Sequence, residues 1–152
     1  MRIIPASPLA KSLMEFDSTI FTQQVVISGV SINAQKVVPG DLFIAFAGAN
    51  THGISYLAQA ISNGAVAVLS DKKIEASIPS FIHSKPREIV GAISAWLYGH
   101  PFESLKAIGI TGTNGKTTTA NLVKQIWQLN SIKSGLIGTL GVEIAEIGRA
   151  HV

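Results

Sequence analysis

The sequence predicts an α/β fold in two parts: a small N-terminal domain over residues 1–104, then the start of a second domain with a mostly parallel sheet. Three observations lead to this prediction. Short, nearly continuous apolar runs alternate with segments of helical periodicity. A Gly-His-Pro sequence at residues 99–101 then interrupts the alternation. After it, a new apolar run leads through a glycine-rich turn into another helical segment.

The first part begins with an apolar run, Val25–Val30, which predicts a strand. A turn at Gly40-Asp41 leads into a second run, LFIAFAG, whose continuous apolar character indicates burial on both faces. Residues 54–63 carry apolar side chains at helical spacing and end at Gly64, before the strand AVAVLS. A strand-helix-strand unit is therefore expected.

A further short strand, residues 81–83, precedes a helix that begins at Pro86, because proline suits the first position of a helix. One face of this helix is expected to pack in the core through Ile89, Val90, Ile93, Trp96 and Leu97. The helix should stop at residues 99–101. Residues 100–105 then form a link between the domains.

The second part covers residues 105–146, with a strand expected at 107–111 and a helix of about 14 residues after it. The apolar stripe of this helix is marked by Leu122, Ile126 and Leu129, and a strand begins within 134–137. Because a doubly wound sheet needs more units than these, its core should be unfinished. Exposed apolar surface is therefore expected at Ile108, Leu122 and Ile137. Residues 147–152 resemble a read-through sequencing adapter and are interpreted as a non-native tail.

The composition is that of a globular protein, with 47% hydrophobic and 14% charged residues. The net charge of +3 is spread over scattered Lys and Arg residues, so nucleic-acid binding is not indicated. The absence of cysteine excludes disulfides, thiolate metal sites and a cysteine nucleophile. No apolar run approaches the roughly 20 residues of a membrane span. We expect a cytoplasmic protein without membrane contacts. Its four histidines, interpreted as surface or structural residues, are His52, His83, His100 and His151.

The most informative stretch is AIGITGTNGKTTT, which joins a short apolar run to a Gly-Lys-Thr turn before a helix. Gly112 and Gly115 allow the backbone to turn sharply and to aim successive N–H groups at one anion. Lys116 adds a mobile positive charge, and Thr117 adds a hydroxyl suited to Mg²⁺. The helix contributes the positive end of its dipole. The pattern therefore predicts binding of a nucleoside triphosphate.

This run departs from the usual P-loop, because Ile110 stands where that pattern needs a glycine. Its TGTNGKTTT form resembles the ATP site of the Mur ligase superfamily, the ATP-dependent amide-forming enzymes of peptidoglycan synthesis. The order of further runs is similar to the branch of that family that adds a diamino acid. Those runs, which extend to about residue 141, are VVPGDLFIAFAG, THGISYLAQAISNGAVAVL, WLYGHP and GLIGTLG.

The resemblance implies ATP and Mg²⁺ as cofactors, with a catalytic role for Lys116 and a metal contact for Thr117. The ATP-binding residues it implies are Gly112, Thr113, Asn114, Gly115, Lys116, Thr117 and Thr118. In the family, ATP activates the D-glutamyl carboxylate of UDP-MurNAc-L-Ala-D-Glu, and the amine of meso-diaminopimelate or lysine then forms an amide. This chain alone is expected to be inactive, and the full-length protein is expected to be a monomer.

The resemblance also assigns the UDP end of the substrate to the N-terminal domain. The implied contacts are Ile32, Ala34, Ala49, Asn50 and Thr51. Relatives carry Asp-Ser-Arg where this chain has residues 33–35, Asn-Ala-Gln, so a hydroxyl is lost and an ion pair becomes two amides. Alternatively, this loop only closes the end of a sheet. Two further alternatives are a non-catalytic nucleotide-binding or interaction module and another Mur-type ligase such as cyanophycin synthetase.

Overall fold

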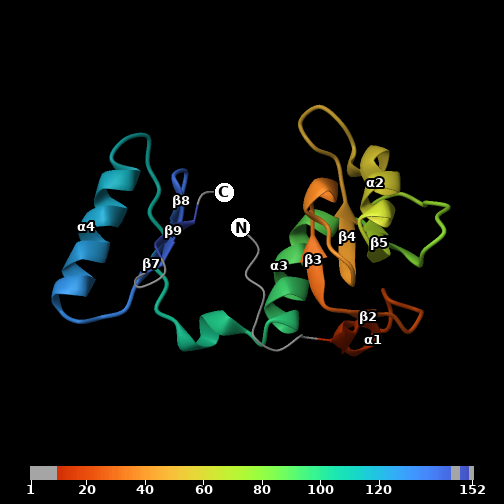
Figure 1. Ribbon diagram of the computed structural model, residues 1–152, viewed down its shortest axis with the longest axis horizontal. Coiled ribbons are helices and arrows are strands. Elements are labelled where there is room, and N and C mark those ends of the chain that lie inside the picture. The colour runs from red at the N-terminus through yellow and green to blue at the C-terminus, as the bar shows by residue number, and fades with distance from the viewer. Residues whose placement is uncertain (1–9, 145–147, 151–152) are drawn as a thin grey trace. The chain divides into compact units, whose positions relative to one another are not determined.

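The computed structural model describes residues 10–144 and 148–150. Within these residues the chain divides into two compact units, which meet in sequence between Leu105 and Lys106 and are described separately below. Both contain helices and strands, as the ribbon shows (Figure 1). The fold is α/β, as the sequence predicts.

The first unit is built on a parallel sheet whose four strands lie side by side in sequence order. They are β3 (Gly29–Ser31), β4 (Asp41–Ala45), β5 (Ala65–Ser70) and β6 (Ser80–Ile82). Every residue of β4 is buried, which confirms the predicted burial for residues 42–45; the end of the same run, residues 46–48, is half-buried to exposed. Since all four strands are parallel, their carboxyl ends lie at the same edge of the sheet.

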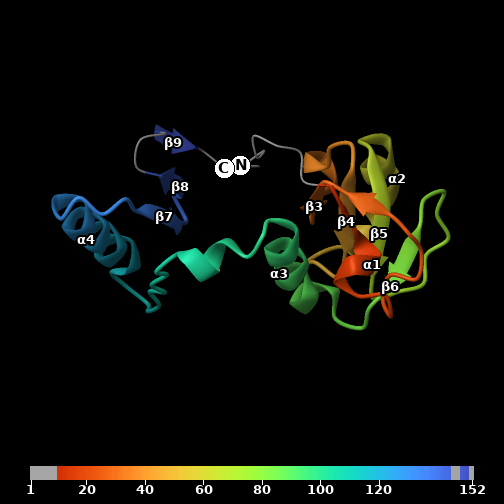
Figure 2. The same cartoon turned by 90° about the horizontal axis from the view of Figure 1, so that it is seen from below.

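Alternate residues of the sheet face two separate hydrophobic clusters. On one face, α2 (Leu57–Ser62) packs against Phe43, Ala45 and Val68. On the other face, α3 (Pro86–Leu97) covers side chains that include Leu42. The helices therefore lie on opposite sides of the sheet, as two views at right angles show (Figures 1 and 2).

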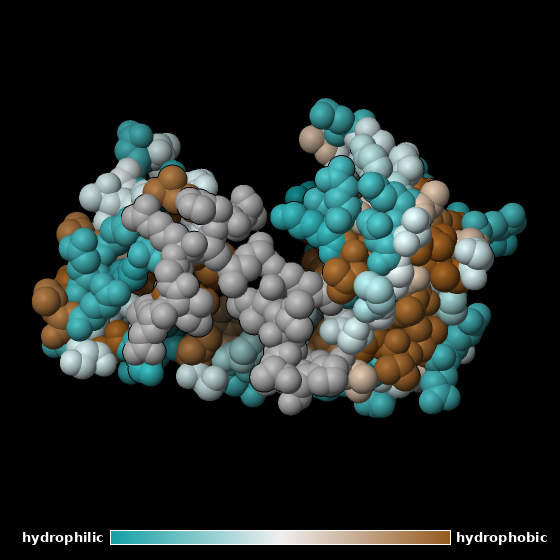
Figure 3. Space-filling model, viewed as in Figure 1, coloured by the Kyte–Doolittle hydropathy of each residue, from teal (hydrophilic) through white to brown (hydrophobic). Residues whose placement is uncertain are grey.

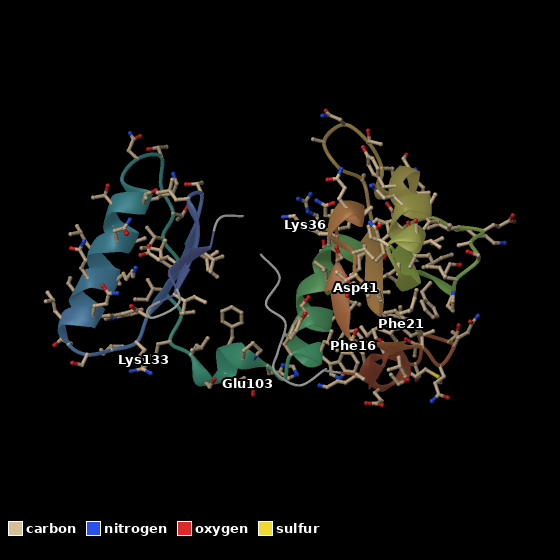
Figure 4. The ribbon with its side chains drawn as sticks, in the orientation of Figure 1. Phe16, Phe21, Lys36, Asp41, Glu103 and Lys133 are labelled. Atoms are coloured by element: carbon tan, nitrogen blue, oxygen red, sulfur yellow. The ribbon has the colours of Figure 1, made fainter. Side chains whose placement is uncertain are left out.

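The cluster under α3 is extended by the N-terminal residues, which form α1 (Leu13–Phe16) and the antiparallel pair β1 (Lys11–Ser12) and β2 (Val26–Ile27). The Phe21 ring contacts the rings of Phe81 and Phe16 edge-on, with centroids 5.0 Å and 6.2 Å away. The Phe16 and Phe21 side chains appear close together in the stick view (Figure 4). These rings close the core beside the sheet.

The predicted strand over residues 25–30 is in fact two strands, β2 and β3. The first pairs with β1 and the second with β4, so the chain changes sheets at Ser28, whose N–H donates to the Gly40 carbonyl. The predicted helix over 54–63 is similarly split into a 3₁₀ turn, Gly53–Tyr56, followed by α2. An apolar sequence pattern does not reveal such breaks, because the residues before and after each break pack in the same hydrophobic cluster.

The α3 helix confirms its predicted start and end. Pro86 is its first residue, and Ile93 and Leu97 are completely buried. It ends before Gly99 and His100, which have φ of 75° and 52°, a left-handed conformation that terminates a helix. An exposed 3₁₀ turn, Pro101–Ser104, follows.

The second unit consists of α4 (Lys116–Leu129) and an antiparallel sheet of β7 (Gly135–Gly138), β8 (Gly141–Ile144) and β9 (Gly148–Ala150). The Lys124 ammonium of α4 forms an ion pair of 2.5 Å with the Glu143 carboxylate of β8. A mostly parallel sheet was expected here, whereas the strands formed are antiparallel. Residues 147, 151 and 152 of the predicted non-native tail lie outside the described residues.

The prediction of a strand at residues 107–111 is wrong, because among the residues that the structure describes this stretch takes part in no ladder. A parallel strand acquires its hydrogen bonds from neighbouring strands, and the described strands of this unit, β7, β8 and β9, pair with one another. The expected apolar exposure is confirmed, with Ile108, Leu122 and Ile137 exposed by 57%, 54% and 81%. Apolar side chains are visible at the surface of this unit (Figure 3). Among the described residues, no helix is long and apolar enough to cross a membrane.

Candidate functional site

The loop before α4 has the backbone shape that its glycines predict. Gly115 is the N-cap residue of α4 with φ of 76°, and Gly112 has φ of 150°. A Cβ at Gly115 would meet no atom within 4 Å, so the conformation rather than the space requires glycine there. The first N–H groups of a helix project from its N-terminus, and in α4 no side chain of the described residues caps them. This is the geometry of an anion-binding helix terminus.

Lys116, the first residue of α4, folds back over this loop. Its ammonium donates to the carbonyl oxygens of Gly112 and Thr113, the latter at 3.3 Å. An ammonium has three N–H donors, so one donor remains for an anion when both carbonyl bonds are kept. The charge therefore sits beside the first turn of the helix, where an anion would also meet the helix dipole.

The structure brings all the predicted ATP-binding residues together in one exposed turn, residues 112–118. Thr117 lies in the first turn of α4, where its carbonyl accepts a hydrogen bond of 2.9 Å from the Asn121 amide. Among residues 10–144 and 148–150, no group of three or more His, Cys, Asp or Glu residues could hold a metal ion.

The predicted uridine-binding residues lie after β3 and β4, at the carboxyl edge of the parallel sheet. Ile32 is 59% exposed. Residues 49–51 are also exposed, at the tip of the loop that rises above β4 in Figure 1. Ala34 differs, because its side chain is buried in the core and its carbonyl accepts from the Asn63 amide at 2.8 Å.

The Asn-Ala-Gln sequence at residues 33–35 forms a locally hydrogen-bonded turn. The Asn33 side-chain oxygen accepts a hydrogen bond of 2.9 Å from the Gln35 N–H and so caps the 3₁₀ turn Ala34–Lys36. An aspartate would cap this turn in the same way, since both side chains present an oxygen at that position. Either residue at position 33 is therefore compatible with the turn.

One pair at this edge was not predicted from the sequence. The His52 Nε2 lies 2.8 Å from the Asp71 Oδ1, which joins the loop after β4 to the end of β5. Burial raises the pKa of the Asp71 carboxyl, but hydrogen bonds, foremost that from His52, outweigh this and hold the pKa below 3.8. The two residues are 19 apart in the sequence, a spacing typical of no motif.

The comparisons with known proteins agree with this geometry. Residues 26–98 match the model described as Mur ligase family, catalytic domain, and residues 110–151 match the Mur ligase middle domain. The chain belongs to the Mur ligase family. Together the two matches cover about three quarters of the chain.

Among its Mur ligase relatives is the UDP-N-acetylmuramoyl-L-alanyl-D-glutamate--2,6-diaminopimelate ligase of Streptomyces coelicolor, 40% identical over 94% of this chain and 29% of that protein. A solved structure of a ligase with the same name has a TM-score of 0.69 at 24% identity, over 92% of this chain and 30% of that one. The MurF ligase of Thermotoga maritima in complex with ADP has a TM-score of 0.52 at 25% identity, over 66% and 23%. The chain thus spans less than a third of the length of these relatives.

Proposed function

We propose that this chain is the N-terminal part of an ATP-dependent ligase that joins a diamino acid to UDP-MurNAc-L-Ala-D-Glu. The observation that carries the proposal is the Gly-Lys-Thr turn at the N-terminus of α4, with left-handed Gly115 as its cap and Lys116 folded over it. The turn lies within the match to the Mur ligase middle domain. In this proposal residues 1–104 bind the UDP-sugar and residues 105–146 begin the ATP-binding domain.

The turn fits ATP by the chemistry of its donors. Uncapped N–H groups and the Lys116 ammonium suit the β- and γ-phosphates, and the side chains of Thr113, Asn114 and Thr118 add further donors. ATP, when bound, supplies the phosphoryl group that makes a carboxylate oxygen a good leaving group. Lys116 then stabilises negative charge that develops on that group, which is the catalytic role we propose for it.

For Mg²⁺ the chain offers a partial site. The Thr117 hydroxyl is one oxygen donor at the head of α4, a position suited to a cation that also contacts phosphate. Since the described residues contain no carboxylate cluster, the other ligands would come from ATP, water or other parts of the complete ligase. We propose that Mg²⁺ binds there only together with ATP.

We propose that the uridine end of the substrate contacts Ile32 and residues 49–51. An exposed isoleucine and an exposed polar loop at the same edge of the sheet suit the flat face and the polar edge of a nucleobase. Because the side chain of Ala34 is buried, any contact at that residue would involve its backbone. We expect weak but detectable binding of UDP. No binding is proposed for nucleic acid or membranes, and the proposed setting is the cytoplasm, with a monomeric ligase.

The ligase proposal is tested with the complete protein that carries this chain, supplied with ATP, UDP-MurNAc-L-Ala-D-Glu and either meso-diaminopimelate or lysine. Phosphate release that requires all three substrates, with an amide product seen by mass spectrometry, is expected. The names of the relatives favour diaminopimelate over lysine. Binding of ATP without turnover under any of these conditions would favour a non-catalytic nucleotide-binding module instead.

The uridine proposal is tested separately by titrating UDP into the 152-residue chain and following backbone amide shifts. Shifts at Ile32 and at residues 49–51 are expected, with none at the control residues of the exposed turn Pro101–Ser104. If UDP causes no change around Ile32 and residues 49–51, this assignment is wrong.

A further inference from the structure

His52 makes hydrogen bonds with both nitrogens of its imidazole ring. The Nδ1 accepts from the Ile54 N–H at 3.2 Å, which caps the 3₁₀ turn Gly53–Tyr56. An acceptor nitrogen carries no proton, so the ring proton resides on Nε2 and is donated to Asp71 at 2.8 Å. Both groups are largely buried, with the side chains 17% and 29% exposed. One side chain therefore fixes the loop backbone and also ties it to a neighbouring strand.

The loop that His52 fixes, residues 47–52, is a narrow hairpin closed by backbone hydrogen bonds. The Gly48 N–H donates to the Thr51 carbonyl at 3.0 Å, and the Gly53 N–H donates to the Phe46 carbonyl at 2.9 Å. Ala47 and His52 form an antiparallel bridge across the stem. The tip, residues 49–51, is exposed, and its side chains form no hydrogen bond or ion pair with the residues that the structure describes. The conformation of the tip therefore depends on what holds the stem.

Asp71 provides a firm anchor for the stem. It follows β5 directly, and β5 lies beside β4, the strand from which the loop emerges. The Asp71 Oδ1 also accepts from the Ser70 hydroxyl at 3.3 Å, and Ser70 is completely buried. The loop is thus tied to the carboxyl end of a central strand, where the backbone is held on both sides by the sheet.

We propose that His52 and Asp71 are a positioning pair, which holds the loop 47–52 in the conformation that binds a uridine nucleotide. The pair does not contact the ligand; it acts through the loop backbone. The inference rests on the proposed function of residues 49–51, and it adds the two residues that set their placement.

The test compares amide hydrogen exchange and UDP affinity in the 152-residue chain and its variants. His52→Asn keeps an oxygen that can cap the Ile54 N–H but is too short to reach Asp71. We expect exchange at Gly48 and Gly53 to become roughly fivefold faster and UDP affinity to fall by about the same factor, the effect of one ordinary hydrogen bond. Asp71→Ala should reproduce both changes, and the double variant should add little to either.

Two matched variants control for loss of structure. Asp71→Asn retains an oxygen that accepts from His52, so it should restore most of the affinity lost in Asp71→Ala. His100→Asn changes another histidine–carboxylate pair, with Glu103 at 3.8 Å, and should alter neither measurement. Asparagine tolerates the left-handed conformation of residue 100.

The outcomes separate this inference from the uridine assignment. Unchanged exchange at Gly48 and Gly53 in both His52→Asn and Asp71→Ala would overturn the positioning pair, and so would faster exchange with unaltered UDP affinity. If the variants exchange faster but the wild-type chain binds no UDP, the restraint on the loop is supported and the uridine assignment is overturned. In wild type, imidazole ¹⁵N shifts should show the proton on Nε2; a proton on Nδ1 would contradict the hydrogen bonding on which the pair depends.

Discussion

Two amphipathic helices, α3 in the first unit and α4 in the second, have similar sequence patterns and very different surroundings. The stripe of α3 is covered, with Ile93 and Leu97 at 0% exposure and its other members partly buried against the same core. The stripe of α4 is open, with Leu122 and Ile126 exposed by 54% and 57%. An apolar stripe thus shows which face of a helix would be covered, and only a sufficient sheet beside it covers that face.

The same difference separates the two candidate sites. The loop 47–52 depends on a finished sheet, because β4 and β5 hold both of its anchors. The turn 112–118 is formed locally, by two left-handed glycines and the start of α4. A locally formed candidate site such as the turn 112–118 therefore keeps its backbone conformation even though the apolar side chains of its unit are exposed.

The largest expected effect tests the difference in core packing. Phe21→Ala removes a fully buried ring with two aromatic neighbours, and should lower the free energy of unfolding of the first unit by about 3–5 kcal/mol. Ile126→Ala on the open face of α4 should cost less than about 0.5 kcal/mol. Denaturant unfolding followed by fluorescence distinguishes the units, since Trp96 belongs to the first and Trp127 to the second. Equal losses would contradict the comparison.

The sequence predicted best those elements that local chemistry or strong burial determines. The β5 strand runs over Ala65–Ser70 as expected, and α4 has the predicted 14 residues. The prediction of a strand at residues 107–111 was wrong because an apolar run forms a strand only where neighbouring strands supply its hydrogen bonds, and the sequence pattern alone does not show whether they do. The burial of Ala34 was missed because a small apolar residue gives little indication of the direction in which its side chain points.

The candidate sites also differ in how far local sequence determines them. The turn 112–118 could be predicted because glycine, lysine and threonine have specific roles there within one short run. The His52–Asp71 pair could not, since it arises from the parallel pairing of β4 with β5, which brings distant residues together. Such contacts become visible only when the register of the sheet is known.

The next effect concerns the locally formed site. In the complete ligase, Lys116→Ala should lower the rate at saturating ATP by roughly 10²-fold or more, because it removes a charge that meets developing negative charge. The side chain is exposed, so the unfolding transition should not move. Lys106→Ala, an exposed lysine of the same unit, is the control. A wild-type rate in Lys116→Ala would mean that this turn only connects a loop to a helix.

A smaller effect is expected at the neighbouring residue. Thr117→Ala removes one hydroxyl that we propose as a metal contact, and should lower the rate about tenfold at low Mg²⁺. Added Mg²⁺ should recover part of this loss, which it should not do for Lys116→Ala. Thr119→Ala, an exposed threonine outside the turn, is the matched control. If the loss in Thr117→Ala is independent of Mg²⁺ concentration, the hydroxyl does not contact the metal.

The smallest effect concerns the site that depends on the sheet. Because the folded pKa of Asp71 lies below its ordinary value of 3.8, the ionised group stabilises the fold above that pH. This stabilisation is lost as the pH falls through the folded pKa. The difference in unfolding temperature between wild type and Asp71→Asn, followed by Trp96 fluorescence, should therefore be constant near neutral pH and narrow below about pH 4. The Trp127 transition should show no such dependence, because Asp71 belongs to the other unit. A difference that stays constant down to about pH 2 would show that the charge of Asp71 contributes nothing and that its hydrogen bond to His52 acts through geometry alone.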